Sequence, residues 1–199
     1  MVGKSEEEMK LNELTIKQDV NKIARDKNLM AGTAAKIVLK KYGWNILGIG
    51  TEGAVAEHPN KNYVLKFFSA NSQYCRYITD VVMKLPNNIH VPKISRQMKH
   101  LNGTTYNYIC MEKLNELPLV RIDDFAKEFK VLYKIGVSFG KDNIYVPDYS
   151  GYNVNETPDK DWFELCEMLF TKKGDAYLDL HEGNFMLRGD TLVITDPYY

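Results

Sequence analysis

Residues 177–199 read YLDLHEGNFMLRGDTLVITDPYY and place acidic residues on both sides of an asparagine. Asp179 stands five positions before Asn184, and Asp196 stands twelve positions after it. Apolar residues flank a turn at residues 188–190, which predicts a short β-hairpin. Because a hairpin brings its two ends together, we expect Asn184 and Asp196 to lie side by side.

These residue types suit phosphoryl transfer. Amide and carboxylate oxygens are hard donors, so Asn184 and Asp196 are candidate ligands for Mg²⁺ that bridges nucleotide phosphates. Asp179 is a candidate acceptor for the proton of an attacking hydroxyl. Taken singly, Asp179 can also be read as a loop or capping carboxylate, and His181 as a structural, hydrogen-bonding histidine.

A glycine pattern precedes this stretch in the first half of the chain. Residues 47–55 read LGIGTEGAV, so Gly48, Gly50, Gly53 and Val55 spell GxGxxGxV. Such glycines also serve ordinary tight turns. The chain continues after the last glycine as a strand and not as a helix, which favours a flap over nucleotide phosphates rather than a dinucleotide fingerprint.

Lys66 lies within the strand-like run YVLKFF at residues 63–68. Strand alternation places Val64, Lys66 and Phe68 on one face. An unpaired ammonium among apolar side chains is costly to bury. Two interpretations follow: Lys66 binds phosphate, or it lies on an edge strand and reaches water.

The patterns along the whole chain predict an α+β fold in three parts. A helical N-terminal extension covers residues 1–43, a lobe with five antiparallel strands covers 44–114, and a reduced, mainly helical lobe covers 115–199. We expect strands at 44–50, 53–59, 62–68, 93–101 and 104–112, and helices at 72–85, 121–135 and 159–172.

The amino-acid composition limits the classes of partner and the cellular compartment that we expect. The 199 residues carry 26 basic and 26 acidic side chains, so no global charge points to nucleic acid or to a membrane. The cysteines are odd in number and form no CxxC pair, which fits free thiols in a reducing compartment. No signal peptide and no long apolar run is evident. We expect a cytoplasmic protein.

The order of these motifs along the chain resembles that of the protein-kinase-like fold. The motifs are the glycine pattern, Lys66, the Met111–Glu112 pair and the D-x4-N-x11-D pattern. The nearest resemblance is to the early-gene serine/threonine protein kinases of short-tailed bacteriophages, which share the D-x-H-x-G-N loop and the ITDP segment. It runs from about Trp44 to Asp196. It implies ATP and Mg²⁺ as cofactors, and host proteins of transcription or RNA processing as substrates in an infected bacterial cytoplasm.

The resemblance also assigns roles to single residues. The residues that it implies for the nucleotide are the flap glycines Gly48, Gly50 and Gly53, the phosphate lysine Lys66, the adenine contacts Val55, Val64 and Met186, the gatekeeper Met111, and the hinge residues Glu112 and Leu114. The residues that it implies for catalysis and metal binding are Asp179 as catalytic aspartate, His181 beside it, and Asn184 and Asp196 as Mg²⁺ ligands.

The sequence departs from that family at three points. The helix expected at residues 72–85 holds no glutamate for Lys66, so the partner is Asp80 or absent. Tyr-Leu precedes Asp179 where most protein kinases have His-Arg, and D-P-Y replaces D-F-G without a recognisable activation segment. The chain is then part of a longer protein or a minimal kinase.

Two further functions stay open. The missing glutamate favours a catalytically weak, kinase-shaped binding module that inhibits or recruits a host factor. His181 stands where aminoglycoside-type phosphotransferases also have histidine, which leaves a small-molecule phosphotransferase as the third reading.

Overall fold

The computed structural model describes residues 15–16, 18–20, 22–23, 31–49, 53–59, 61–94, 97–100, 106–138 and 158–199. The chain divides into two compact units, residues 1–72 with 94–113 and residues 73–93 with 114–199. The predicted boundary after residue 114 lies one residue from this division. The segment 73–93, which we predicted for the first lobe, belongs to the second unit.

The first unit is built on the predicted five-stranded antiparallel sheet, with strand order β1-β2-β3-β5-β4. Its strands are β1 Asn45–Ile49, β2 Gly53–Glu57, β3 Tyr63–Ser69, β4 Lys99–His100 and β5 Tyr106–Glu112. The strand expected at 93–101 is shorter than predicted. Among its described residues only β4 and a bridge between Ile94 and Met111 pair with β5.

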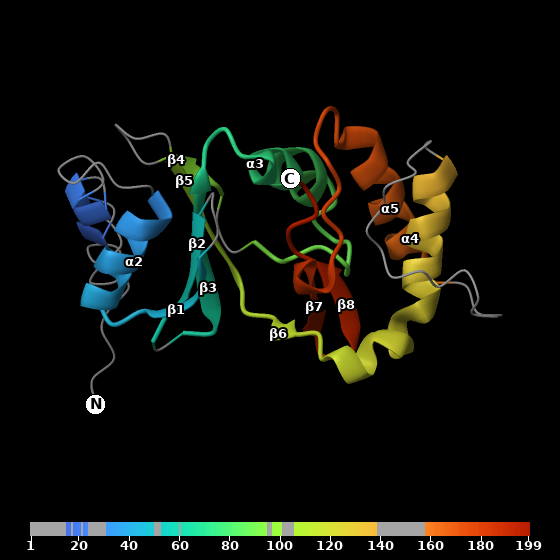
Figure 1. Cartoon of the computed structure of the whole chain (residues 1–199), viewed down its shortest axis with the longest axis horizontal. Helices are drawn as coiled ribbons and strands as arrows, with labels where there is room; N and C mark the ends of the chain where they lie inside the picture. The colour runs from blue at the N-terminus through green and yellow to red at the C-terminus, as the bar shows by residue number, and fades with distance from the viewer. Residues whose placement is uncertain are drawn as a thin grey trace. The chain divides into compact units, whose positions relative to one another are not determined.

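Helix α2 (Ala31–Lys41) packs on one face of this sheet (Figure 1). Its apolar side chains, led by Val38 and Leu39, form one buried cluster with Ala54, Ala56 and Leu65 of the sheet. Ile16 and Val20, from helical residues of the N-terminal extension, join the same cluster. The described part of this extension therefore packs in the same apolar core as α2 and the sheet.

In the second unit, residues 73–84 do not form the single α-helix that we predicted. One α-helical turn, α3 (Gln73–Arg76), leads into a π-helical turn, η1 (Tyr77–Val81), and a 3₁₀ turn, η2 (Val82–Lys84). Tyr77 is fully buried in η1, and its hydroxyl donates to the Ile194 carbonyl oxygen at 2.6 Å. This hydrogen bond to a residue distant in sequence occurs within the π-helical turn, and the spacing of apolar residues does not predict such a turn.

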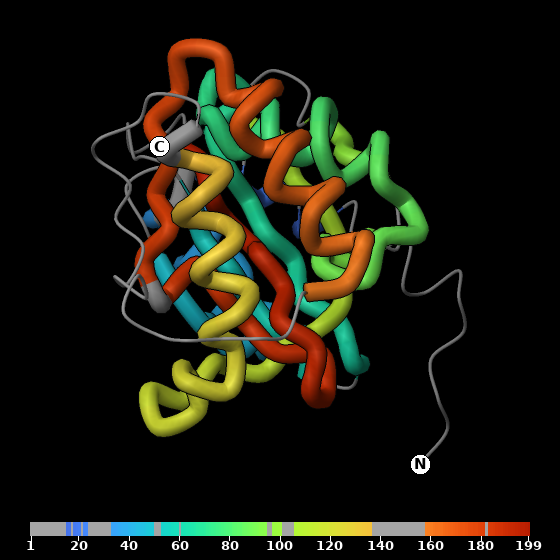
Figure 2. The backbone as a smooth tube through the Cα atoms, turned by 90° about the vertical axis from the view of Figure 1, so that its right-hand side faces the viewer, coloured from blue at the N-terminus to red at the C-terminus, as the bar shows by residue number. Residues whose placement is uncertain are grey.

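Two longer helices lie side by side in the second unit, α4 (Ala126–Ser138) and α5 (Lys160–Lys172) (Figure 2). A 3₁₀ helix, η3 (Leu119–Phe125), precedes α4, where we had predicted α-helix from residue 121. Asp159 caps α5, because its carboxylate accepts from the Trp162 N–H at 3.0 Å. None of the helices in the described ranges is long and apolar enough to cross a membrane.

The predicted hairpin of the second unit is confirmed. Strands β7 (Phe185–Arg188) and β8 (Thr191–Ile194) pair antiparallel, and Gly189 turns between them with φ of 61°. A short strand that the sequence did not predict, β6 (Asn115–Glu116), pairs with the outer side of β7. The Phe185 ring meets Phe129 of α4 edge to face at 4.9 Å, which holds the hairpin on the helices.

Candidate functional site

Four of the predicted nucleotide residues, Val55, Val64, Lys66 and Met111, lie on one face of the sheet in the first unit. The strand register sets Val55 of β2 and Ile109 of β5 directly opposite Lys66 of β3. Val64 and Met111 face each other two positions further along, on the same side. The face that α2 covers carries the alternate residues, so the Lys66 side is the sheet's other face.

Lys66 is placed on the central strand of this sheet. Strand β3 has β2 on one side and β5 on the other, and the Lys66 side chain is half-buried. The alternative of an edge-strand lysine is therefore wrong. Asp80, one of the two alternatives given for the partner of Lys66, accepts from the Thr79 hydroxyl at 3.1 Å in the second unit, and those alternatives stay open.

The flap glycines differ in whether the surrounding structure requires a glycine at their position. A Cβ built on Gly53 would lie 1.9 Å from the Phe67 carbonyl oxygen, so the pairing of β2 with β3 requires glycine there. A Cβ on Gly48 would meet nothing within 4 Å. A β-bulge lies beside Gly48 between Ile46 and Gly48. The prediction for Gly50 lies outside the described residues.

In the second unit a dense set of backbone bonds surrounds Asp179. Its N–H donates to the Pro197 carbonyl oxygen at 2.8 Å, and Tyr177 and Tyr199 exchange two backbone bonds of 2.9 Å. Leu178 and Tyr198 form an antiparallel bridge between these pairs. The D-P-Y segment is thus paired along its backbone with the chain that leads into Asp179, an arrangement that opposes a flip at this point.

Asn184 ties the loop to the hairpin. Its side-chain amide nitrogen donates to the Asp179 carbonyl oxygen at 2.7 Å, and its own N–H donates to the His181 carbonyl oxygen at 2.9 Å. Thr195 binds the Asn184 carbonyl oxygen twice, through its N–H at 2.9 Å and its hydroxyl at 3.1 Å. The structure therefore places the chain at Asp179, at Asn184 and one residue before Asp196 together, as the hairpin predicted.

His181 has a defined orientation beside Asp179. Its Nδ1 accepts from the Gly183 N–H at 3.0 Å, so the ring proton lies on Nε2, which is 3.7 Å from the Asp179 carboxylate. A Cβ on Gly183 would come within 2.7 Å of the His181 ring. Gly183 belongs to the D-x-H-x-G-N loop, but the sequence analysis predicted no role for it. The histidine two positions earlier was the feature of the sequence that could have indicated a need for glycine here.

Buried tyrosines lie near the Asp196 carboxylate. Burial raises the pKa of Tyr74 and of Tyr77 well above the ordinary tyrosine value, and the negative charge of Asp196 adds to both shifts. Tyr77 packs against Tyr198 edge to face at 5.9 Å, and the Tyr198 hydroxyl donates to the Leu169 carbonyl oxygen at 2.8 Å. These phenols stay protonated at neutral pH, and the Tyr77 hydroxyl bonds to the last residue of β8 through the Ile194 carbonyl oxygen.

The donor set fits a hard cation. With its amide nitrogen bonded to Asp179, Asn184 offers its amide oxygen, and Asp196 offers a carboxylate. Both side chains are partly exposed. Among the described residues no group of three or more His, Cys, Asp or Glu side chains gathers as a metal site, so water and phosphate oxygens would have to complete the coordination of Mg²⁺.

The remaining predicted residues divide between the units. Glu112 ends β5 opposite Tyr63, and Leu114 is buried in the second unit one residue before β6. Met186 is half-buried in β7, opposite Glu116 of β6 and Val193 of β8. The pairing of Met186 with Val55 and Val64 around adenine joins residues of different units and stays a prediction.

No family profile and no curated protein matches the chain. It is similar to the crystal structure of Rad53 1-466 in complex with AMP-PNP at 14% identity and a TM-score of 0.38, over 82% of this chain and 42% of that one. It is similar to the apo form of a thermostable mutant of aminoglycoside phosphotransferase APH(4)-Ia at 12% identity and a TM-score of 0.38, over 81% of this chain and 70% of that one.

This chain thus spans less than half the length of the first of these structures. At a TM-score of 0.38 neither likeness bears on what this chain binds or does.

Proposed function

We propose that the chain is an ATP-dependent phosphotransferase that transfers the γ-phosphoryl group to serine or threonine hydroxyls of proteins. The observation that carries the proposal is the hydrogen-bonded set of Asp179, Asn184 and Thr195, which joins the loop of the candidate base to the residue before Asp196. Lys66 supports it from the first unit, because this half-buried lysine shares a sheet face with Val55, a predicted adenine contact.

In this mechanism Asp179 accepts the proton of the attacking hydroxyl while the new O–Pγ bond forms and the bond from Pγ to the β,γ-bridging oxygen breaks, releasing ADP. Lys66 binds the α- and β-phosphates and offsets their charge. Bound Mg²⁺ would neutralise charge that develops on the β- and γ-phosphate oxygens, with Asn184 and Asp196 as its ligands. Positioning and electrostatic stabilisation then supply most of the acceleration.

The proposal is tested with two isosteric variants. Asp179→Asn and Asp196→Asn keep side-chain volume, so we expect folded proteins. Asp179→Asn should lose about 10²–10⁴-fold in phosphate transfer, the range that a catalytic base contributes, and Asp196→Asn should lose transfer because it removes a proposed carboxylate ligand of Mg²⁺. Purified protein, radiolabelled ATP and Mg²⁺ would be incubated with a bacterial lysate, and labelled proteins would be counted after electrophoresis. Transfer at the wild-type rate by either folded variant would refute the assigned roles.

The second candidate is a binding module that keeps the shape and little of the catalysis. The observation in its favour is the segment 73–84, in which Asp80 is the only carboxylate and bonds to its neighbour Thr79. In the lysate experiment this candidate predicts no labelled band with the wild type, together with retention of a host protein on the immobilised chain. Host proteins of transcription or RNA processing, in a bacterial cytoplasm, are the substrates or partners that we propose.

A further inference from the structure

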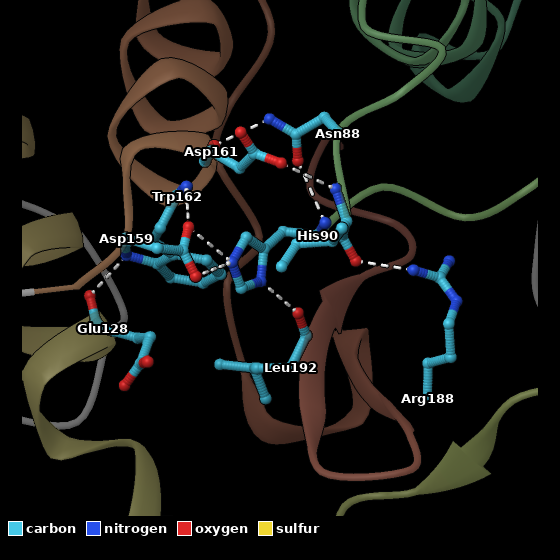
Figure 3. Close-up of polar contacts among 9 residues, drawn as sticks. Asn88, His90, Glu128, Asp159, Asp161, Trp162, Arg188 and Leu192 are labelled. Atoms are coloured by element: carbon cyan, nitrogen blue, oxygen red, sulfur yellow. Dashed lines mark hydrogen bonds and ion pairs between the residues drawn. The ribbon is translucent and has the colours of Figure 1, made fainter.

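A buried histidine outside the proposed phosphotransfer residues joins several elements of the second unit (Figure 3). His90 is 3% exposed. Its Nδ1 lies 2.6 Å from the Leu192 carbonyl oxygen of β8, and its Nε2 lies 3.0 and 3.1 Å from the two carboxylate oxygens of Asp159, the cap of α5. The Trp162 ring meets the imidazole edge to face at 5.0 Å.

Both ring nitrogens of His90 face groups that can only accept. A carbonyl oxygen carries no proton, and neither does an ionised carboxylate, whereas a neutral imidazole has a single N–H. Burial raises the pKa of Asp159, but hydrogen bonds from His90 and from the Trp162 N–H outweigh it and leave that pKa below its ordinary value. Both bonds of His90 therefore form together only when the ring carries two protons.

The backbone around His90 is bonded to both strands of the hairpin. The Ile194 N–H donates to the His90 carbonyl oxygen at 3.0 Å. Arg188 of β7 donates to the carbonyl oxygens of Ile89 at 2.6 Å and of Val91 at 2.8 Å. The segment around His90 is therefore bonded to β8 two residues before Asp196.

Several charged groups lie around the ring. Asp161 accepts from the Ile89 N–H at 3.3 Å through its carboxylate and from the Asn88 side chain at 2.7 Å through its carbonyl oxygen. Glu128 is buried, and burial raises the pKa of its carboxyl. Together with Asp159 and the Arg188 guanidinium, these are the charges that adjacent elements present to this segment.

We propose that His90, held as the imidazolium, is a positioning residue that ties the strand leading to Asp196 to the first turn of α5. The proposal rests on the proposed role of Asp196 in binding Mg²⁺. With one ring proton lost, a nitrogen lone pair would face an acceptor oxygen, and either the Leu192 or the Asp159 contact would open. How rigidly Thr195 and Asp196 are held then depends on the second ring proton of His90, which is distant in sequence but bonded to the same strand.

The first experiment observes the protons directly. Protein with ¹⁵N-labelled histidine would be measured by NMR near pH 6, and the His90 signals would be assigned by their loss in His90→Asn. We expect both ring nitrogens of His90 to be protonated. In Asp159→Asn the cap survives, because asparagine also caps helices, but the anionic partner is gone, so the His90 ring should become neutral. A neutral His90 ring in the folded wild type would overturn the proposal.

The second experiment measures positioning in two ways. In His90→Asn and Asp159→Asn we expect the Mg²⁺ concentration for half-maximal binding of a fluorescent ATP analogue to rise about three- to tenfold, the equilibrium effect of one lost hydrogen bond. We also expect the Thr195 amide to exchange its hydrogen several-fold faster. His100→Gln is the matched control, because His100 bonds to Asn107 in the first unit, and it should change neither quantity.

The outcomes separate this proposal from the proposed function. Unchanged Mg²⁺ dependence and unchanged Thr195 exchange in a folded variant would overturn the role of His90, and Asp159→Asn decides the question if His90→Asn does not fold. If the wild type binds no nucleotide while the NMR signals and amide exchange behave as expected, the phosphotransferase function fails and the coupling of His90 to β8 stands.

Discussion

Alanine substitutions at two flap glycines should differ in their effect on stability. In Gly53→Ala the new methyl carbon would start 1.9 Å from the Phe67 carbonyl oxygen, with the Phe67 carbonyl carbon at 2.9 Å. A non-bonded carbon and oxygen need more than about 3 Å, so β2 must move away from β3 by about 1 Å or lose a ladder bond. In Gly48→Ala the methyl group meets nothing within 4 Å.

These distances set the magnitudes. Backbone atoms cannot rotate away as a side chain can, so Gly53→Ala should lower the free energy of unfolding by about 2–3 kcal/mol, the upper part of the range for overpacked sites. Gly48→Ala should stay within about 0.5 kcal/mol of wild type. If the Gly48 backbone approaches the phosphates of ATP, the added methyl group should instead weaken ATP binding about tenfold, equivalent to about 1.4 kcal/mol.

Urea unfolding followed by circular dichroism measures the first quantity, and titration with a fluorescent ATP analogue measures the second. Gly48→Ala is the stability control for Gly53→Ala, because its methyl group meets no atom within 4 Å. A Gly53→Ala protein with wild-type stability would refute the close approach of the two strands. A Gly48→Ala protein with wild-type stability and wild-type affinity would remove Gly48 from the flap.

Three further predictions concern single side chains. Lys66→Met should abolish phosphate transfer in the labelling assay, because it removes the ammonium group proposed to bind the α- and β-phosphates. Gly183→Ala should displace the His181 ring and lower transfer as much as His181→Ala does, with no further loss in the double mutant; additive losses would contradict this. Glu128 has a buried oxygen without a hydrogen-bond partner in the described structure, and burial raises the pKa of its carboxyl. Its ionised form thus destabilises the fold above the unfolded carboxyl pKa, so Glu128→Met should raise Tm by about 2–4 °C at pH 8, less towards pH 4, in a thermal melt.

Local patterns predicted much of the fold. Period-two alternation located the strands β1, β2, β3 and β5, and the Arg-Gly-Asp turn located the β7–β8 hairpin, because strand faces and turn residues depend on neighbours in sequence. The same alternation placed Lys66 and Val64 on one face. It could not tell whether their strand is central or at an edge, since strand order depends on pairings between distant segments.

The sequence by itself determined the residue types at the candidate site, the α+β class and the hairpin that joins Asn184 to the end of β8. Only the tertiary structure decided that Lys66 lies on a central strand, that residues 73–84 wind through a π-helical turn, and that His90 is buried between two acceptors. The physical reason is that hydrogen-bond partners such as Leu192 and Asp159 lie 102 and 69 residues away, and no local preference specifies which distant oxygen a buried nitrogen will meet.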